Sequence, residues 1–240
     1  MSTPPPVLVV TGGSRGIGAS IVRMAAARGW RVAFDYMADD TAAARLTVPG
    51  EVVALKGDAA DEAHVEALFN LAARLGPVRG AIANAGITGG KGRVEAFDRA
   101  TLDRVLAINV TGAFLLAKHA IRRMTEGGSI VMVSSMAARL GGGGEWVHYA
   151  LSKGAVDTMT IGLSREVARQ GIRVNAVAPG MIETEIHAAA GDPDRAQRMG
   201  AETPIGRAGT ADEVAEAVLW LLSDAASYVT GAIMPVAGGR

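Results

Sequence analysis

The stretch VLVVTGGSRGIG, residues 7–18, joins a short apolar run to a glycine-rich turn. A helical period of apolar residues follows at Ile21, Val22 and Ala25, so the order is strand, turn, helix. The glycines stand where the helix opens. Bare backbone at such a point lets the phosphates of a dinucleotide approach the helix N-terminus, which makes the turn a candidate cofactor site.

The spacing of these glycines leaves two interpretations open. Gly12, Gly16 and Gly18 do not follow the pattern G-x-G-x-x-G, because three residues separate the first from the second. A tight turn between strand and helix that only needs glycine explains the segment as well as a phosphate-binding turn does. The remainder of the chain has to distinguish them.

Strand and helix patterns alternate along the whole chain. Runs such as VLVV at 7–10 and IVMV at 130–133 are continuously apolar, which is typical of a parallel sheet covered on both faces. We therefore predict an α/β fold: a single-domain, Rossmann-type, doubly wound parallel sheet flanked by helices on both faces. Beyond the first strand, the predicted strands are 31–36, 51–56, 79–83, 129–134 and 172–178, and the predicted helices 65–75, 102–124 and 150–169.

Three parts of the chain are expected to differ in organisation. Residues 1–6, with three consecutive prolines, predict a disordered or extended N-terminal lead, and residues 7–240 one Rossmann-fold domain. Within that domain, residues 183–206 mix glycine, proline and charges with weak helical periodicity. We interpret this segment as a mobile lid over a substrate.

Composition excludes several kinds of protein. Lys plus Arg and Asp plus Glu are balanced at 24 each, so no net charge favours nucleic acid or a membrane surface as a partner. There is no cysteine, which excludes disulfides, a thiol nucleophile and thiolate metal sites. His64 and His119 lie in helical patterns and are expected to be surface or interface residues and not ligands, so no metal site is predicted. No signal-like or membrane-spanning run is evident, and the expected location is the cytoplasm.

Polar residues stand at the predicted strand ends and on one helix face. Asn84-Ala85-Gly86 and the pair Ser134-Ser135 each follow a strand. Tyr149 and Lys153 are spaced to share one face of a helix. A free tyrosine titrates near 10, and an adjacent ammonium would favour its ionised form, although such a pair is common by chance. Asn109 lies in an apolar helical pattern, either as a hydrogen-bonded residue that bends the helix or as part of a polar relay.

Taken in order, these motifs resemble the short-chain dehydrogenase/reductase family, in particular its 3-oxoacyl-carrier-protein reductase-like and glucose-dehydrogenase-like members. The motifs are Thr11-Gly12-x-x-x-Gly16-Ile17-Gly18, Asn84-Ala85-Gly86, Asn109, Ser135, Tyr149-x-x-x-Lys153 and Pro179-Gly180. The resemblance implies an NAD(P)-dependent oxidoreductase that acts on CH–OH or C=O groups. It also implies that Ser135 and Tyr149 hold the substrate oxygen, that Lys153 binds the nicotinamide ribose and lowers the pKa of Tyr149, and that Asn109 orders a water.

The family's cofactor contacts are carried over in the same way. They fall on Gly12, Ser14, Arg15, Gly16, Ile17, Gly18, Tyr36, Asp58, Ala59, Asn84, Ala85, Gly86, Tyr149, Lys153, Pro179, Gly180, Ile182 and Thr184. One departure concerns the catalytic spacing, since Ser135 precedes Tyr149 by 14 positions where many relatives have 13. We expect one extra residue in the loop 141–144, and Glu145, Trp146 and His148 are candidate pocket residues.

The preference between NADP(H) and NAD(H) depends on the end of the second strand. Asp35 lies 17 residues after Gly18, close to the position of an acid that binds the ribose hydroxyls of NAD. The family alignment instead places the discriminating position at Tyr36, and Arg15 is suited to bind a 2′-phosphate through two hydrogen bonds. NADP(H) is therefore favoured, with NAD(H) as the alternative.

The expected partners are a small carbonyl or alcohol substrate and further copies of the chain. Helices 102–124 and 150–169 are apolar on more than one face, and the family pairs them between subunits, so we expect a dimer or tetramer. Two alternative functions remain: reduction of 3-oxoacyl thioesters, and a non-catalytic NADP(H)-binding sensor or scaffold that kept the fold. Substrate identity and the physiological direction are not readable from the sequence.

Overall fold

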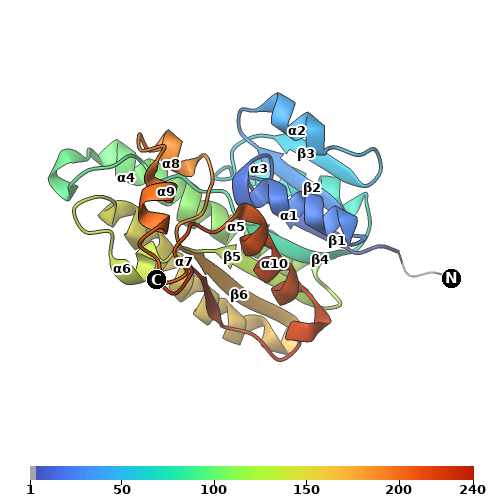
Figure 1. Ribbon diagram of the computed structural model, residues 1–240. Coiled ribbons are helices and arrows are strands. Elements are labelled where there is room, and N and C mark those ends of the chain that lie inside the picture. The colour runs from blue at the N-terminus through green and yellow to red at the C-terminus, as the bar shows by residue number, and fades with distance from the viewer. Residues whose placement is uncertain (1–3) are drawn as a thin grey trace.

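The computed structural model describes residues 4–240, and residues 1–3 of the predicted lead lie outside them. All seven strands are parallel and follow the order β3-β2-β1-β4-β5-β6-β7. This is the predicted doubly wound sheet, with helices on both faces (Figure 1). The strands are β1 Val7–Val10, β2 Arg31–Tyr36, β3 Val52–Lys56, β4 Val78–Ala83, β5 Gly128–Val133, β6 Ile172–Pro179 and β7 Ile233–Val236.

The two faces of β1 show how the apolar pattern forms two cores. Val7 and Val9 lie in one core, and Leu8 and Val10 in the other, because successive side chains of a strand point to opposite faces. The first core includes α3 Glu62–Ala73, α5 Gly112–Arg123 and α7 Val147–Val167, and the second α1 Gly16–Ala27 and α10 Ala211–Leu222. A strand covered on both faces has no solvent side, which explains the uninterrupted apolar run.

The winding of the sheet changes direction beside β1. The strands that follow along the chain add on the β2 side first and then on the β4 side, so β1 pairs with both. In open α/β sheets a crevice forms at this reversal, outside the carboxyl ends of the strands. The glycine turn after β1 and the Asn84 turn after β4 meet there.

Several helices begin at side chains that cap the free N–H groups of the first turn. The Asp61 carboxylate accepts from the N–H of Ala63 and starts α3, earlier than the predicted start at residue 65. Thr210 and Glu213 form a capping box at the start of α10. Helix α10, strand β7 and helix α2 Asp40–Leu46 were not predicted from the sequence, although the capping pair Thr210 and Glu213 of α10 is visible in it.

The predicted helix 102–124 is helical throughout but is not one regular α-helix. The structure has α4 Arg99–Leu106, a π-helical turn Ala107–Thr111 and then α5. The prediction of one regular helix was wrong because the Asn109 side chain bonds outside the helix, as described below. Within residues 4–240, the continuous helical run Arg99–Arg123 is also the one long and apolar enough to cross a membrane by length and composition. Here α5 packs on β4 as a core helix.

The segment 183–206 contains two short helices, α8 Ile186–Ala189 and α9 Arg195–Gly200. Both lie beyond the carboxyl end of β6, on the side of the molecule where the chain ends (Figure 1). A further short helix, α6 Ala137–Leu140, follows β5. At the other end of the chain, Pro6 is extended and its carbonyl accepts from the N–H of Arg31, so this part of the lead continues β1.

Candidate active site

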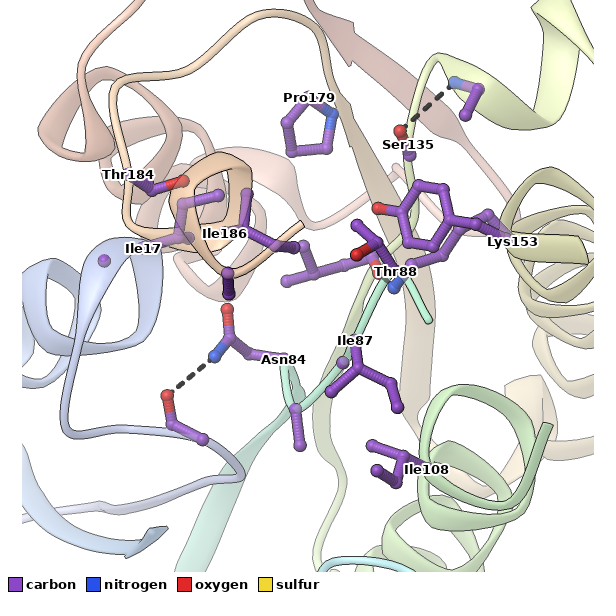
Figure 2. Close-up of a pocket in the computed structure, with 18 of the residues that line it drawn as sticks. Ile17, Asn84, Ile87, Thr88, Ile108, Ser135, Lys153, Pro179, Thr184 and Ile186 are labelled. Atoms are coloured by element: carbon purple, nitrogen blue, oxygen red, sulfur yellow. Dashed lines mark hydrogen bonds between the residues drawn. The ribbon is translucent and has the colours of Figure 1, made fainter. Parts of the chain in front are cut away.

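A cavity of about 890 Å³ lies at the carboxyl ends of the strands. Its wall runs from the glycine turn after β1 to the start of α7. Eighteen of the twenty predicted site residues line it, and Gly18 and Asn109 do not. Figure 2 shows Ile17 and Thr184 on one side of the cavity and Ser135 and Lys153 on the other, with Asn84 between them.

The glycine turn is held in shape by backbone geometry and by one asparagine. Gly12 and Gly16 have φ of +66° and +51°, in the left-handed region that favours glycine. A Cβ at Gly18 would collide with the Gly12 carbonyl oxygen, so Gly18 allows α1 to approach the turn from behind. The Asn84 amide donates to the carbonyls of Thr11 and Gly12 at 3.0 and 2.9 Å. Asn84 therefore ties the end of β4 to the turn.

Asp35 supports the same turn from β2. Its side chain is 2% exposed, and its Oδ1 accepts from the Gly12 N–H at 2.6 Å. Its Oδ2 lies 3.3 Å from Nε2 of His64, so both carboxylate oxygens face protein groups. Burial raises the pKa of Asp35, and the bonds to His64 and Gly12 oppose that rise. The prediction of a surface position for His64 was wrong: its side chain is nearly buried and fixes Asp35.

The next residues of β2 form the edge of the cavity. The Tyr36 hydroxyl donates to Asp40 at 3.0 Å, and Lys56 binds the same carboxylate at 3.0 Å. Arg15 is the exposed residue that precedes α1, and its side chain has no hydrogen bond or ion pair within residues 4–240. Asp58 accepts from the Ala60 N–H and from Arg104, at 2.9 and 2.8 Å. Among the described residues at this end of the cavity, Arg15 is thus a cation that no other side chain binds.

Tyr149, Lys153 and Ser135 form the other end. One turn of α7 separates Tyr149 from Lys153, whose Nζ lies 5.8 Å from the centre of the Tyr149 ring. That Nζ donates to the Val133 carbonyl at 2.7 Å and not to the phenol. The Ser135 hydroxyl accepts from the Ala137 N–H at 3.1 Å and lies close enough to Tyr149 to oppose the rise of its pKa. Ser134 is instead buried, with its hydroxyl directed to the Lys153 carbonyl at 3.4 Å. Of the two serines, Ser135 is the one beside the tyrosine.

Burial dominates the titration of this group. It raises the pKa of Tyr149, and the hydrogen bond from Ser135 opposes the rise. It lowers the pKa of Lys153 from 10.5 to about 8, with Asp157 opposing that shift. The expected lowering of the tyrosine pKa by Lys153 is absent from the protein alone, because the ammonium is directed at Val133. The phenol therefore keeps its proton at neutral pH.

Asn109 does not line the cavity, and its side chain forms hydrogen bonds with the backbone of the loop that follows β4. Its Oδ1 accepts from the Ile87 N–H at 2.9 Å, and its Nδ2 donates to the Ile87 carbonyl and to Ser152 Oγ, both at 2.9 Å. These bonds leave the helix and coincide with the π-helical turn. Asn109 is thus hydrogen-bonded within the protein, and its role in a polar relay stays a prediction.

Of the three candidate pocket residues before Tyr149, two line the cavity and one does not. Glu145 and Trp146 line the cavity, whereas His148 is buried beside Phe97 and contacts the Thr88 carbonyl through Nε2 at 2.8 Å. His119, predicted at the surface, is also buried, stacked on Phe69. Arg195 and Arg240 line the cavity too and were not predicted, since nothing in the local sequence indicates which distant turn they approach.

Comparison with known proteins identifies the family. The sequence model of a family described as enoyl-(acyl carrier protein) reductase matches residues 12–240. A short-chain dehydrogenase/reductase from Serratia marcescens superposes with a TM-score of 0.90 at 35% identity, over 99% of each chain. The chain belongs to the short-chain dehydrogenase/reductase family. It is accordingly an oxidoreductase that acts on hydroxyl or carbonyl groups, and the family implies an NAD(P)(H) cofactor.

Two curated relatives of this short-chain dehydrogenase/reductase match along nearly the whole chain. The uncharacterized oxidoreductase YgfF of Escherichia coli is 46% identical over 98% of this chain and 99% of its own length. Cis-4-hydroxycyclohexanecarboxylate dehydrogenase of Sinomonas cyclohexanicum is 41% identical, over 97% and 95%. The resemblance inferred from the motifs is thereby confirmed at the level of the family.

Proposed function

We propose that this protein transfers a hydride between NADP(H) and a small carbonyl or alcohol, with Tyr149 as the general acid and base. The observation that carries the proposal is the meeting of Ser135 and Tyr149 at one end of a cavity whose other end is the glycine turn. One group binds at each end: the reacting oxygen at Tyr149, and the phosphates of a dinucleotide at the turn.

The residues of the cavity fit a dinucleotide. Gly12 and Gly16 expose backbone at the start of α1, and a Cβ at Gly86 would stand 3.4 Å from Lys153 Nζ, in the space between the two ends. Gly12, Ser14 and Arg15 would hold the phosphates, and Tyr149 and Lys153 would hold the nicotinamide ribose. When bound, the nicotinamide supplies or accepts the hydride.

Side chains of the protein supply and remove the proton of the reaction. In reduction, Tyr149 gives its phenolic proton to the substrate oxygen as negative charge develops there, and Ser135 donates a hydrogen bond to the same atom. A pKa raised by burial keeps that proton on Tyr149 at neutral pH and thus suits the reductive direction. Oxidation reverses each step and needs the ionised phenol, so its rate should rise with pH.

The contacts around Asp35 support NADP(H) over NAD(H). An acid that selects NAD must present its carboxylate to the ribose hydroxyls, and the oxygens of Asp35 face Gly12 and His64. Arg15 is exposed at the edge of the cavity and is suited to a 2′-phosphate. The discriminating contact is therefore assigned to Arg15.

The cavity is also lined by Leu140, Met181 and Ile186, and this apolar lining favours an apolar substrate. A second candidate is the reduction of 3-oxoacyl thioesters, because the printed description of the matching family names an acyl carrier protein. A non-catalytic NADP(H)-binding protein is the third candidate. The complete set Ser135, Tyr149 and Lys153 favours an enzyme over it.

A second copy of the chain is the proposed partner. Phe114 on α5 and Leu151 on α7 are more than half exposed, at 55% and 56%, and Ile161 on α7 is exposed as well. Helices α5 and α7 pack against each other, so these side chains present apolar surface on adjacent elements. A dimer or tetramer that pairs these helices would cover it.

The test is a titration with NADPH and NADH followed by a turnover screen. Tight binding of NADPH, and its consumption with small ketones or aldehydes, is the expected result. Turnover restricted to 3-oxoacyl thioesters would select the second candidate. Binding without turnover of any carbonyl or alcohol would select the non-catalytic protein, and binding of neither cofactor would contradict the assignment of the cavity.

A further inference from the structure

Arg195 is a buried arginine in the segment 183–206, here called the lid. It is the first residue of α9, it lines the cavity, and it is 5% exposed. A guanidinium remains charged in a protein, and its burial is unfavourable unless other groups compensate the charge. The partners of Arg195 therefore identify the part of the protein that the lid contacts.

Asp192 of the lid lies 3.9 Å from Nη1 of Arg195, and the partners outside the lid are consecutive residues before α7. Arg195 donates from Nη1 and Nη2 to the two carboxylate oxygens of Glu145, at 3.1 and 2.6 Å. Its Cζ lies 4.1 Å from the centre of the Trp146 ring. A two-bonded arginine–carboxylate pair fixes orientation as well as distance, and stacking on the indole adds a cation–π contact. The lid is thus bound to this segment by a charge pair and a ring. Lys91, whose Nζ lies 3.0 Å from Glu145 and 3.5 Å from Asp192 of the lid, adds an ionic contact beside them.

The same residues are continuous with the catalytic helix. Trp146 is the residue that caps α7, its carbonyl accepts from the Ala150 N–H, and Tyr149 follows three positions later. The Trp146 N–H donates to the Gly142 carbonyl at 2.7 Å, which anchors the glycine loop as well. A shift of Arg195 therefore changes the position of the lid relative to Tyr149.

Two buried donors of this group have no acceptor. Nε of Arg195 and Nε1 of Trp146 are without a hydrogen-bond partner among residues 4–240. A buried N–H without a partner opposes the closed arrangement, and water would satisfy both groups if the lid opened. The ion pair and the stacking favour closure while the two donors favour opening, so the contact is suited to reversible opening.

We propose that Glu145, Trp146 and Arg195 form a latch that closes the lid over the substrate and makes Arg195 a positioning residue for substrate specificity. The proposal rests on the proposed function for the identity of the ligand, an apolar carbonyl or alcohol compound. The charges of Glu145 and Arg195 compensate each other, and Leu140, Met181 and Ile186 complete the wall. The closed latch thus retains uncharged, apolar substrates.

The kinetic test compares Arg195→Ala with Arg198→Ala. Arg198 is on the same helix but is exposed, pairs only with Asp192 and does not line the cavity. For Arg195→Ala we expect KM for an apolar ketone to rise about tenfold, corresponding to the loss of one charge-assisted contact. We expect a smaller change in kcat and an unchanged Kd for NADPH, with wild-type values throughout for Arg198→Ala. Arg195→Lys, which keeps the charge but lacks the planar fork, should be intermediate.

Hydrogen exchange of the lid amides supplies a readout independent of turnover. Residues 183–200 should exchange faster in Arg195→Ala and in Glu145→Gln, with unchanged protection of the sheet, and the double variant should be no faster than the single ones. Lid exchange and KM equal to those of Arg198→Ala would overturn the proposal, as would faster exchange with unchanged KM. If the wild type turns over no carbonyl or alcohol, the proposed function fails, whereas the exchange data still test the latch.

Discussion

At the scale of single residues, Asp35 illustrates what a sequence position alone does not specify. Its distance from the glycine turn is close to that of an NAD-selecting acid, and the direction of its carboxylate decides the matter. Both oxygens of that carboxylate contact protein groups, the Gly12 N–H and His64. Asp35 lies on β2, whereas His64 lies on the helix α3. The proposed preference for NADP(H) therefore rests on a tertiary contact.

Arg15→Ala should weaken NADPH binding far more than NADH binding. Loss of a charge-assisted contact to the 2′-phosphate should raise the Kd for NADPH by about 10- to 100-fold, and the Kd for NADH by less than about twofold. Fluorescence titration of both cofactors measures this. Arg23→Ala is the control, because Arg23 lies on the same helix but pairs with Asp212 outside the cavity. Equal losses for both cofactors would place the phosphate elsewhere.

Lys153→Met should inactivate the enzyme yet stabilise it at neutral pH. The folded pKa of about 8 lies below 10.5, so the unfolded chain binds the proton more tightly, which costs the folded state up to about 3 kcal/mol below pH 8. The hydrogen bond to Val133 offsets about 1 kcal/mol of this. Wild-type stability from this group therefore rises as the pH goes from 8 to 10.5.

The measurement is thermal unfolding at several pH values. At pH 7, Tm of Lys153→Met should exceed that of the wild type by about 5 °C, and the difference should disappear towards pH 10.5. Lys118→Met removes a lysine on α5 that is paired with Glu62, and it should bring no gain. A Tm of Lys153→Met below the wild-type value at pH 7 would mean that the buried ammonium is stabilising.

At the scale of elements, β7 is partly exposed and was not predicted, whereas the strands β1 to β6 were predictable from their apolar runs. Their predicted limits agree with the structure to within one residue at each end, since apolar runs and turn residues mark them directly. The π-helical turn was not predictable, because its cause is the bonding of Asn109 to Ile87 on a separate loop. A local pattern carries no information about such a partner.

Asn109→Ala should destabilise the fold and straighten this helix. It removes the partners of the half-buried N–H and carbonyl of Ile87, at a cost of about 2–4 kcal/mol. The urea midpoint should fall accordingly. Ser152→Ala, which removes only the acceptor of one Asn109 N–H and the bond from Ser152 to the Tyr149 carbonyl, should cost about half as much. Equal midpoints for Asn109→Ala and the wild type would contradict the structural role of Asn109.

At the scale of the whole molecule, the residues proposed for the chemistry were named from the sequence, whereas several other residues that line the cavity were not. The glycine turn, Asn84 and Ser135 stand at strand ends, where the topology of a parallel sheet brings them together. Tyr149 and Lys153 were selected by their helical spacing and by the resemblance to the family. Arg195 and Arg240 reach the cavity from the lid and from the last residue of the chain. Their placement follows from long-range packing, and it was not predicted.

Phe114→Arg should dissociate the proposed oligomer. A charge at the centre of an apolar contact between copies is unfavourable, and light scattering should show a shift to smaller species. Val94→Arg introduces the same charge at a residue that is 62% exposed and belongs to neither α5 nor α7, so it should leave the mass unchanged. A monomeric wild type, or an unchanged mass for Phe114→Arg, would contradict the pairing of these helices.

The central claim is that Tyr149 exchanges a proton with the substrate oxygen, and the most direct measurement compares turnover by the wild type and by Tyr149→Phe at equal occupancy of NADPH. The substitution removes one hydroxyl and keeps the ring beside Lys153. We predict a fall in kcat by a factor of about 10² to 10⁴ with an almost unchanged Kd for the cofactor. An unaltered kcat would contradict the assignment of Tyr149 as the acid and base.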